Sequence, residues 1–176
     1  MVSRHLIQCA AFLCVLFMSC GQEKNSSISK QVESSSIERV DWMTIEEAEK
    51  AMEKEAKDIY VMVYANWCPH CKKFDQTTYR DPKVIKDLNS KFYPVKLNAH
   101  ANRTITYKGR TFSNPNYDSS KSKNELNAYH EIVYEIKAGS IPSIVFIDKN
   151  MTVKGTELGF KPAGELRSLM AMYKSN

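Results

Sequence analysis

The feature that most constrains the fold of this 176-residue chain is an apolar segment that runs directly into a pair of cysteines. Residues 59–65 read IYVMVYA, a short run of β-branched and aromatic residues that predicts a strand buried on both faces. NWCPHCKKF follows at 66–74, and a proline just inside the start of a helix is a common arrangement. We therefore expect a central strand to deliver Cys68 and Cys71 to the beginning of a helix.

Helices and strands alternate through the chain from residue 40 onward. Thr44 and Glu47 form the pattern of a capping box, which marks the beginning of a helix. Apolar spacing and turn residues indicate the other elements. These are helices at 68–79, 82–89, 124–139 and 162–173, and strands at 91–99, 142–148 and 151–159. The order predicts an α/β fold in which helices pack against one mixed β-sheet.

Residues 1–19 have the composition of an export signal. A basic pair precedes the apolar run LIQCAAFLCVLFMSC, whose length of about fifteen residues falls short of the roughly 20 that span a membrane. The run ends in LFMSCG, which resembles the lipobox of bacterial lipoproteins and predicts that Cys20 is lipidated. Phe17 and Met18 depart from the commonest lipobox, so plain cleavage and a retained anchor stay open as alternatives.

Residues 20–39 lead from the predicted lipidated cysteine to the folded part. After Cys20 the segment reads GQEKNSSISKQVESSSIER, which is polar, rich in serine and free of aromatic residues. Such a composition cannot bury enough apolar surface to fold. We expect a flexible tether that holds a single folded domain at 40–176 near a membrane.

The five cysteines, at positions 9, 14, 20, 68 and 71, reduce to one pair if the signal is removed and Cys20 carries lipid. A disulfide between Cys68 and Cys71 closes a very small loop and would constrain the unfolded chain little. An exported protein with one such pair is not a disulfide scaffold. The pair must therefore be present for its chemistry.

The residue types of this pair leave a metal-binding interpretation open. Cys68, His70 and Cys71 are soft ligands that a copper(I) carrier can use. A structural zinc site needs four ligands, usually from two paired motifs, and the sequence contains no second Cys-x-x-Cys. We expect no metal, and a copper(I)-binding carrier is the alternative from another functional class.

The charge pattern argues against a nucleic-acid partner. The formal net charge is +5, and the lysines are scattered among acidic residues. A basic stripe with interleaved aromatic residues, which is typical of nucleic-acid binding, is not visible.

Four features, in this order, resemble the thioredoxin superfamily over 40–176: YANWCPHCKKF at the end of a central strand, VKLN at 95–98, GSIPSIVFID at 139–148, and LGFKPAGELRSLM at 158–170. The resemblance implies a thioredoxin fold with a central mixed β-sheet flanked by helices. It also implies that Pro142 is the cis-proline of that fold, and that Gly159 is the glycine before the last helix.

The same resemblance assigns roles around the cysteine pair. Cys68 would be the attacking thiolate, since unpaired N–H groups and the helix dipole at a helix N-terminus should lower its pKa below the free value of roughly 8.5. Cys71 would be the resolving thiol. Pro69 would keep the first turn rigid, and Trp67 would cover one side of the pair or simply pack in the core.

The substrate loop is implied in the same way. Pro142 would present the backbone of Ile141 to a client strand beside the disulfide.

One departure from the family concerns proton transfer. The buried acid that the family carries six positions before the first cysteine falls on Met62 in this chain. Lys96 matches the lysine that often neighbours that acid, and it would either serve alone or be an ordinary exposed strand lysine.

The second departure is an insertion at about 101–123, between the second central strand and the helix before the cis-proline. ITYKGRTFSNPNYDSSKSK, at 105–123, predicts a small hairpin around Lys108 and Gly109 that is followed by a polar loop. We expect it to overhang the active-site edge, where it would either select partners or be a passive surface loop.

His70 bears on the direction of electron flow. Cys-Pro-His-Cys also occurs in strongly oxidising relatives of the DsbA type, whose potential is about −120 mV against about −270 mV for thioredoxin. The large helical insertion of those oxidases is absent, and the rest resembles membrane-tethered reductases. We therefore expect a protein that reduces or isomerises disulfides, with a DsbA-like disulfide oxidase as the alternative.

The resemblance also implies the surroundings of the protein. We expect an exported, periplasm-facing monomer that is anchored to a bacterial membrane by lipid on Cys20 and needs no cofactor. Its partners would be client proteins that carry disulfides or dithiols, together with a membrane electron-transfer protein.

Overall fold

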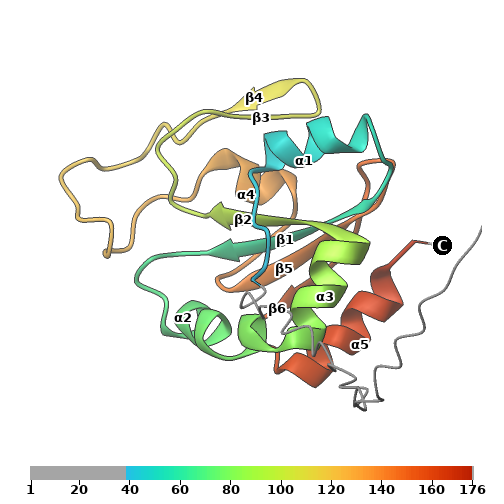
Figure 1. Cartoon of the computed structure of the whole chain (residues 1–176). Helices are drawn as coiled ribbons and strands as arrows, with labels where there is room; N and C mark the ends of the chain where they lie inside the picture. The colour runs from blue at the N-terminus through green and yellow to red at the C-terminus, as the bar shows by residue number, and fades with distance from the viewer. Residues whose placement is uncertain (1–38, 176) are drawn as a thin grey trace, which may run out of the picture. The chain divides into compact units, whose positions relative to one another are not determined.

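The computed structural model describes residues 39–175, so the predicted signal peptide, Cys20 and all of the tether except Arg39 lie outside the described residues (Figure 1). The elements in chain order are α1 (Ile45–Met52), β1 (Asp58–Tyr64), α2 (Pro69–Gln76), the 3-10 helix η1 (Thr78–Arg80), α3 (Pro82–Lys91), β2 (Phe92–Asn98), β3 (Ile105–Tyr107), β4 (Arg110–Phe112), α4 (Glu131–Glu135), β5 (Ser143–Ile147), β6 (Val153–Leu158) and α5 (Ala163–Tyr173). Among these helices, none combines the length and the apolar character needed to cross a lipid bilayer.

The main sheet has the strand order β2-β1-β5-β6. β1 runs parallel to β2 and antiparallel to β5, and β5 runs antiparallel to β6. The sheet is therefore mixed, as the sequence predicts. The segment between β1 and β2 contains α2, η1 and α3. Two adjacent parallel strands require a long crossover connection of this kind.

Side chains of the central strand β1 alternate between two hydrophobic clusters. Ile59, Val61 and Val63 pack in a cluster with residues of α1 and α4, whereas Tyr60 and Met62 pack in a cluster with residues of α2, α3 and α5. In Figure 1 the first pair of helices covers the upper face of the sheet and the other three cover the lower face. Because the side-chain period of a strand is two, one apolar strand supplies both faces.

The predicted helix at 124–139 is wrong over its first half, because α4 comprises only Glu131–Glu135. Leu126, one of the apolar residues whose spacing suggested this helix, is 61% exposed. The side-chain amide of Asn127 forms hydrogen bonds with the backbone of Asp118, and the backbone N–H of His130 donates to the carbonyl of Ala99 at 2.8 Å. A longer helix would need this His130 N–H for its own bond to the residue four positions earlier.

The predicted helix at 68–79 is interrupted. α2 ends at Gln76, and η1 follows after Thr77, whose φ of −127° and ψ of −76° are not helical. The hydroxyl of Thr77 donates to the carbonyl of Lys73 at 2.7 Å, and the hydroxyl of Thr78 donates to the carbonyl of Lys161 at 2.8 Å. The other predicted elements agree with the structure to within two residues at each end.

The predicted hairpin of the insertion is confirmed. β3 and β4 pair antiparallel, and the two turn residues, Lys108 and Gly109, have φ values of 54° and 69°. Positive φ at both central residues matches the right-handed twist of the strands. Ile105 and Tyr107 are buried in the same cluster as α1, so the hairpin is part of the hydrophobic core.

Candidate active site

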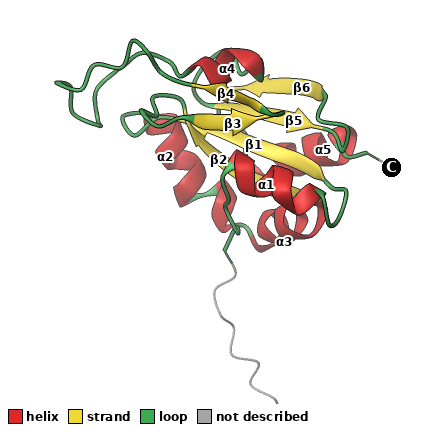
Figure 2. Ribbon diagram, turned by 90° about the horizontal axis from the view of Figure 1, so that it is seen from above, coloured by secondary structure: helices red, strands yellow, loops and turns green. Residues whose placement is uncertain are grey.

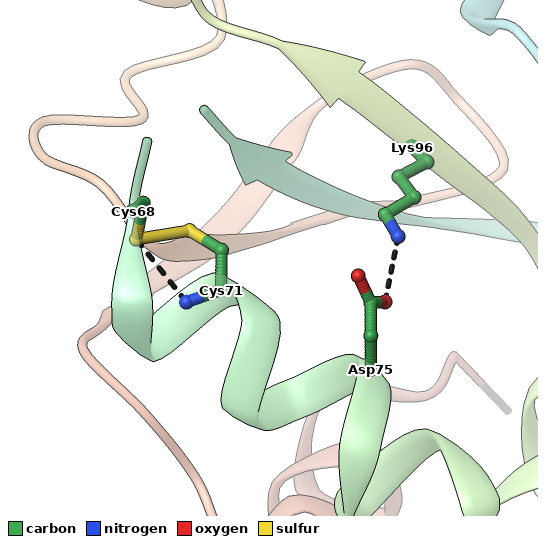
Figure 3. Close-up of a disulfide and its surroundings, with 4 residues drawn as sticks. All are labelled: Cys68, Cys71, Asp75 and Lys96. Carbon is green, nitrogen blue, oxygen red and sulfur yellow. Dashed lines mark hydrogen bonds and ion pairs between the residues drawn. A yellow bond between two sulfur atoms is a disulfide. The ribbon is translucent and has the colours of Figure 1, made fainter. Parts of the chain in front are cut away.

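Cys68 and Cys71 are joined by a disulfide at the beginning of α2, with their Cα atoms 5.3 Å apart (Figure 3). Cys68 is the N-cap residue of this helix, and Pro69 occupies its first turn. The backbone N–H of Cys71 donates to the sulfur of Cys68 at 3.1 Å. One of the unpaired donors at the helix N-terminus is thus directed at this sulfur.

The electrostatic setting of Cys68 favours negative charge on its sulfur. The first turn of α2 carries no acidic residue that would cancel the positive end of the helix dipole. His70 lies in that turn and is exposed, as is Pro69. When the disulfide is reduced, the same N–H and the same dipole stabilise a thiolate on Cys68.

The disulfide is largely covered by the fold. Cys68 is 2% exposed and Cys71 is 4% exposed, and both belong to the cluster beneath α2. Met62 lies in that cluster and is fully buried, so the position where the family carries an acid is apolar here. Any proton that leaves Cys71 must therefore be accepted by another group.

Lys96 is not alone on β2, because its ammonium group contacts the carboxylate of Asp75 at 2.6 Å. Lys96 is paired with Met62 in the sheet register, and Asp75 reaches it from α2. In Figure 3 this ion pair lies further along α2 than the disulfide, with Asp75 directed at Lys96 of β2. The helix that carries the cysteines therefore places a carboxylate on the lysine that is paired with Met62.

Asp75 was missed by the sequence reasoning, although a signal exists. It lies four residues after Cys71, and residues at this spacing share one face of a helix. The charge of Asp75 also acts on Tyr64 at the end of β1. Burial, and then the nearby carboxylate of Asp75, raise the pKa of the Tyr64 hydroxyl.

Trp67 is half-buried and packs against the cluster that contains both cysteines. Its ring stacks on the imidazole of His100, with centroids 6.0 Å apart, and His100 in turn stacks on Tyr129 at 5.1 Å. Trp67 thus packs beside the cysteine pair, and it connects the turn before Cys68 to the segment before α4. The sequence offered no signal for His100.

The peptide bond between Ile141 and Pro142 is cis, as the resemblance implies. The carbonyl of Pro142 accepts a hydrogen bond from the N–H of Gly159 at 2.9 Å, so the glycine before the last helix fixes this loop. Ile141 packs against the cluster that contains Cys68. β5 begins at Ser143, which pairs with Val63 near the end of β1, so the loop and the disulfide lie at the same edge of the sheet.

Two buried tyrosine hydroxyls form a hydrogen bond in the cluster on which α2 packs. The hydroxyls of Tyr60 and Tyr79 are 2.8 Å apart, and burial raises the pKa of both groups. The ring of Tyr79 also stacks on Phe74 of α2 at 5.2 Å. Because both hydroxyls stay neutral, this pair fixes the helix without adding charge beneath the disulfide.

Within residues 39–175, no three side chains of the ligand-forming types His, Cys, Asp and Glu come together as a site. His70 is exposed, and the two cysteines are bonded to each other. Copper(I) would require the reduced pair as its ligands.

Known structures share this architecture at low sequence identity. A thioredoxin from Thermus thermophilus matches with a TM-score of 0.54 and 16% identity over 76% of this chain and 86% of that chain. The DsbH oxidoreductase matches with a TM-score of 0.55 and 16% identity over 81% and 90% of the two chains. The oxidised C-terminal domain of DsbD from Neisseria meningitidis matches with a TM-score of 0.51 and 13% identity over 73% and 91%. At such identities these likenesses show the fold.

No curated protein sequence matches the chain. The sequence model of the thioredoxin-like domain, however, matches residues 45–174, which include every element from α1 to α5. The match contains the strand, the cysteine pair at the helix N-terminus, and the cis-proline loop described above. The chain therefore belongs to the thioredoxin-like domain family.

Proposed function

We propose that this protein is a thiol–disulfide oxidoreductase that reduces or isomerises disulfides in client proteins. One observation carries the proposal, namely the Cys68–Cys71 disulfide at the N-terminus of α2, where the Cys71 N–H donates to the Cys68 sulfur. A sulfur in this setting is both an activated nucleophile and a good leaving group.

The reaction begins from the reduced pair. The Cys68 thiolate attacks one sulfur of a client disulfide, forms a mixed disulfide, and releases the other client sulfur as a thiolate. The Cys71 thiolate then attacks the Cys68 sulfur and displaces the remaining client thiolate. Two electrons pass to the client, and the Cys68–Cys71 disulfide is the oxidised product. Run backwards, the same steps donate a disulfide.

The ion pair between Asp75 and Lys96 is proposed as the route for the Cys71 proton. Asp75 lies one helical turn beyond Cys71 and is half-exposed, so a water molecule can connect the thiol to the carboxylate. Lys96 holds this carboxylate against β2 at 2.6 Å. Lys96 is then a positioning residue, and Asp75 is the proton acceptor.

Client binding is proposed at the cis-proline loop. Ile141 and Pro142 lie at the sheet edge where β1 ends, and an extended client segment can add to the backbone there. We further propose that lipid on Cys20 anchors the domain on the periplasmic side of a bacterial membrane, where a membrane electron-transfer protein keeps Cys68 and Cys71 reduced.

The deciding experiment is the reduction potential of the pair in the domain at 40–176, measured by equilibration in glutathione buffers. A value of about −250 mV or lower supports a reductase that is supplied with electrons. A value of about −150 mV or higher contradicts that direction and identifies a DsbA-like disulfide oxidase, the alternative that His70 favours.

A copper(I) carrier based on Cys68, His70 and Cys71 is the alternative of another class. The reduced domain would then retain one equivalent of copper(I) against a chelator and would fail to reduce a test disulfide. Reduction of the test disulfide by a metal-free sample supports exchange instead.

A further inference from the structure

The segment at 40–43, which leads from the predicted tether towards α1, adds to the outer edge of the main sheet. The backbone N–H of Met43 donates to the carbonyl of Pro94 at 3.0 Å, and the backbone N–H of Lys96 donates to the carbonyl of Met43 at 3.3 Å. Figure 1 and Figure 2 show the chain running along β2, the edge strand, before it enters α1. Two main-chain bonds thus fix this segment beside Lys96.

Asn89 of α3 holds the beginning of the same segment. Its side-chain NH₂ group donates to the carbonyl of Arg39 at 2.9 Å, and its oxygen accepts from the backbone N–H of Asp41 at 3.0 Å. The ring of Trp42 packs edge-on against Tyr79 of η1, with centroids 4.9 Å apart. Trp42 is therefore held both through its neighbours in the chain and through its ring.

Lys96 contacts two aromatic rings as well as a carboxylate. Its ammonium nitrogen lies 5.5 Å from the centroid of Trp42 and 5.2 Å from the centroid of Tyr64. A cation within about 6 Å of an aromatic centroid is attracted by the negative face of the ring. The same nitrogen lies 2.6 Å from the carboxylate of Asp75. Because a free lysine side chain has many rotamers, the two rings favour the few in which the ammonium group stays at Asp75.

The groups that face the Asp75 carboxylate come from three elements. Lys96 on β2 is the cation that forms an ion pair with it among residues 39–175. Tyr64 of β1 and Tyr79 of η1 are the titratable neighbours, and burial, with a further contribution from the charge of Asp75, raises the pKa of both hydroxyls. Both hydroxyls therefore stay neutral at neutral pH. Arg80 of η1 donates from Nε to the backbone carbonyl of Asp75 at 3.2 Å.

We propose that Trp42 is a positioning residue of the exchange reaction, which acts on Asp75 through Lys96. Tyr64 supplies the second ring of this arrangement. The inference rests on the proposed thiol–disulfide exchange and its proton route and deepens both, because it makes the segment at 40–43 a part of the active site.

The step concerned is the release of the mixed disulfide. The S–H bond of Cys71 breaks, its proton passes through water to the Asp75 carboxylate, and the resulting thiolate attacks the Cys68 sulfur and displaces the client thiolate. Without the ring of Trp42, Lys96 leaves Asp75 more often, and the carboxylate is then less often in the position from which water connects it to Cys71.

The test measures the formation and the release of the mixed disulfide by rapid quench. The reduced protein reacts with the symmetrical disulfide of a short cysteine-containing peptide, so that only one mixed disulfide can form. Trp42→Met replaces the ring by a flexible apolar side chain, and Trp42→Phe is the conservative variant that keeps a ring. Phe112→Met is the matched control, since Phe112 is a buried ring that lies 4.9 Å from the guanidinium group of Arg110 in the other hydrophobic cluster.

Trp42→Met should form the mixed disulfide at the wild-type rate and release it about twofold to fivefold more slowly at neutral pH, the factor that corresponds to the loss of one partly exposed cation–π contact. The deficit should shrink towards about pH 9, because Cys71 then ionises without help. Trp42→Phe should keep most of the release rate, and Phe112→Met should keep all of it. In the Asp75→Asn background, Trp42→Met should slow release no further, because its effect passes through Asp75.

A merely structural role predicts different results, each of which overturns the positioning role. These are a release rate of Trp42→Met equal to that of Phe112→Met, a deficit that is the same in both steps or at every pH, and further slowing in the Asp75→Asn background. If Trp42→Met does not fold, Tyr64→Met decides the question by the same criteria, since it removes the second ring. Wild-type release by Asp75→Asn refutes the proton route instead, and failure of the wild type to form the mixed disulfide refutes the proposed function.

Discussion

Replacement of Asp75 by asparagine separates proton transfer from the other steps of the proposed exchange. The substitution keeps the shape of the side chain and removes the carboxylate that Lys96 contacts at 2.6 Å. It leaves Cys68, its N–H donor and the cis-proline loop unchanged. We expect the first attack on a client disulfide to proceed at the wild-type rate and the release of the mixed disulfide to slow, because only release requires Cys71 to lose its proton.

The size of the effect follows from the position of Asp75. Side chains four residues apart on a helix have Cβ atoms about 5–6 Å apart, so the proton crosses through water. General acid–base catalysis is typically worth about 100-fold or more, but the side chain of Asp75 is 47% exposed, and solvent can accept part of the protons in its place. We expect release to slow by about tenfold at neutral pH. The loss of an exposed ion pair should lower the free energy of unfolding by less than about 1 kcal/mol.

Rapid-quench experiments would measure the rates at which the mixed disulfide forms and is released. They would be repeated at several pH values between about 6 and 9, the range in which cysteine thiols ionise. The deficit of Asp75→Asn should shrink as the pH rises, since Cys71 then ionises without help. Glu135→Gln is the matched control, because Glu135 forms a surface ion pair with Arg110 at 3.2 Å on the other face of the sheet. A release rate within twofold of the wild type across this range would refute the proton route.

Three further predictions concern the surroundings of the site. His70→Ala should lower the reduction potential by about 10–20 mV, because it removes the imidazole that stabilises the Cys68 thiolate and hence the reduced form. An unchanged or higher potential in glutathione buffers would contradict this. His130 is fully buried and caps α4 through Nδ1, and burial lowers its pKa below 6.5. As the pH drops below about 6.5, the unfolded chain therefore binds a proton at this residue before the folded protein does, and the free energy of unfolding should fall. Urea titrations of His130→Asn, which can still cap the helix, should show a weaker pH dependence than the wild type, and equal slopes would be evidence against it. Tyr79→Phe should lower the free energy of unfolding by about 1–3 kcal/mol because it leaves the Tyr60 hydroxyl buried without a partner. The double variant Tyr60→Phe/Tyr79→Phe should lower the free energy of unfolding by less than the sum of the two single changes.

The parts of the fold that could be predicted from the sequence are those with a local cause. The apolar run of β1, the capping box at Thr44 and the turn residues Lys108 and Gly109 each specify their own element. The cysteine pair is close in sequence, and its position at a helix N-terminus follows from Pro69. The cis bond at Pro142 could be predicted only through the resemblance.

The parts that could not be predicted depend on contacts between distant residues. The apolar spacing at 124–139 is compatible with a helix, but bonds from Ala99, His100, Asn114 and Asp118 hold its first half in another conformation. Asp75 obtains its partner from a strand 21 residues away. Nothing in the sequence indicates that His100 stacks between Trp67 and Tyr129.

The hairpin of the insertion divides this segment into two parts with different tolerance to change. Ile105, Tyr107 and Phe112 are part of the core that α1 also contributes to, so a deletion that trimmed the chain to a minimal domain would leave apolar surface of α1 open to water. The loop that follows, by contrast, is mostly exposed from residue 115 to residue 126. Substitutions there should have little effect on folding or on the cysteine chemistry. The insertion thus consists of a hairpin stem that is packed in the core and an exposed loop that the core does not constrain.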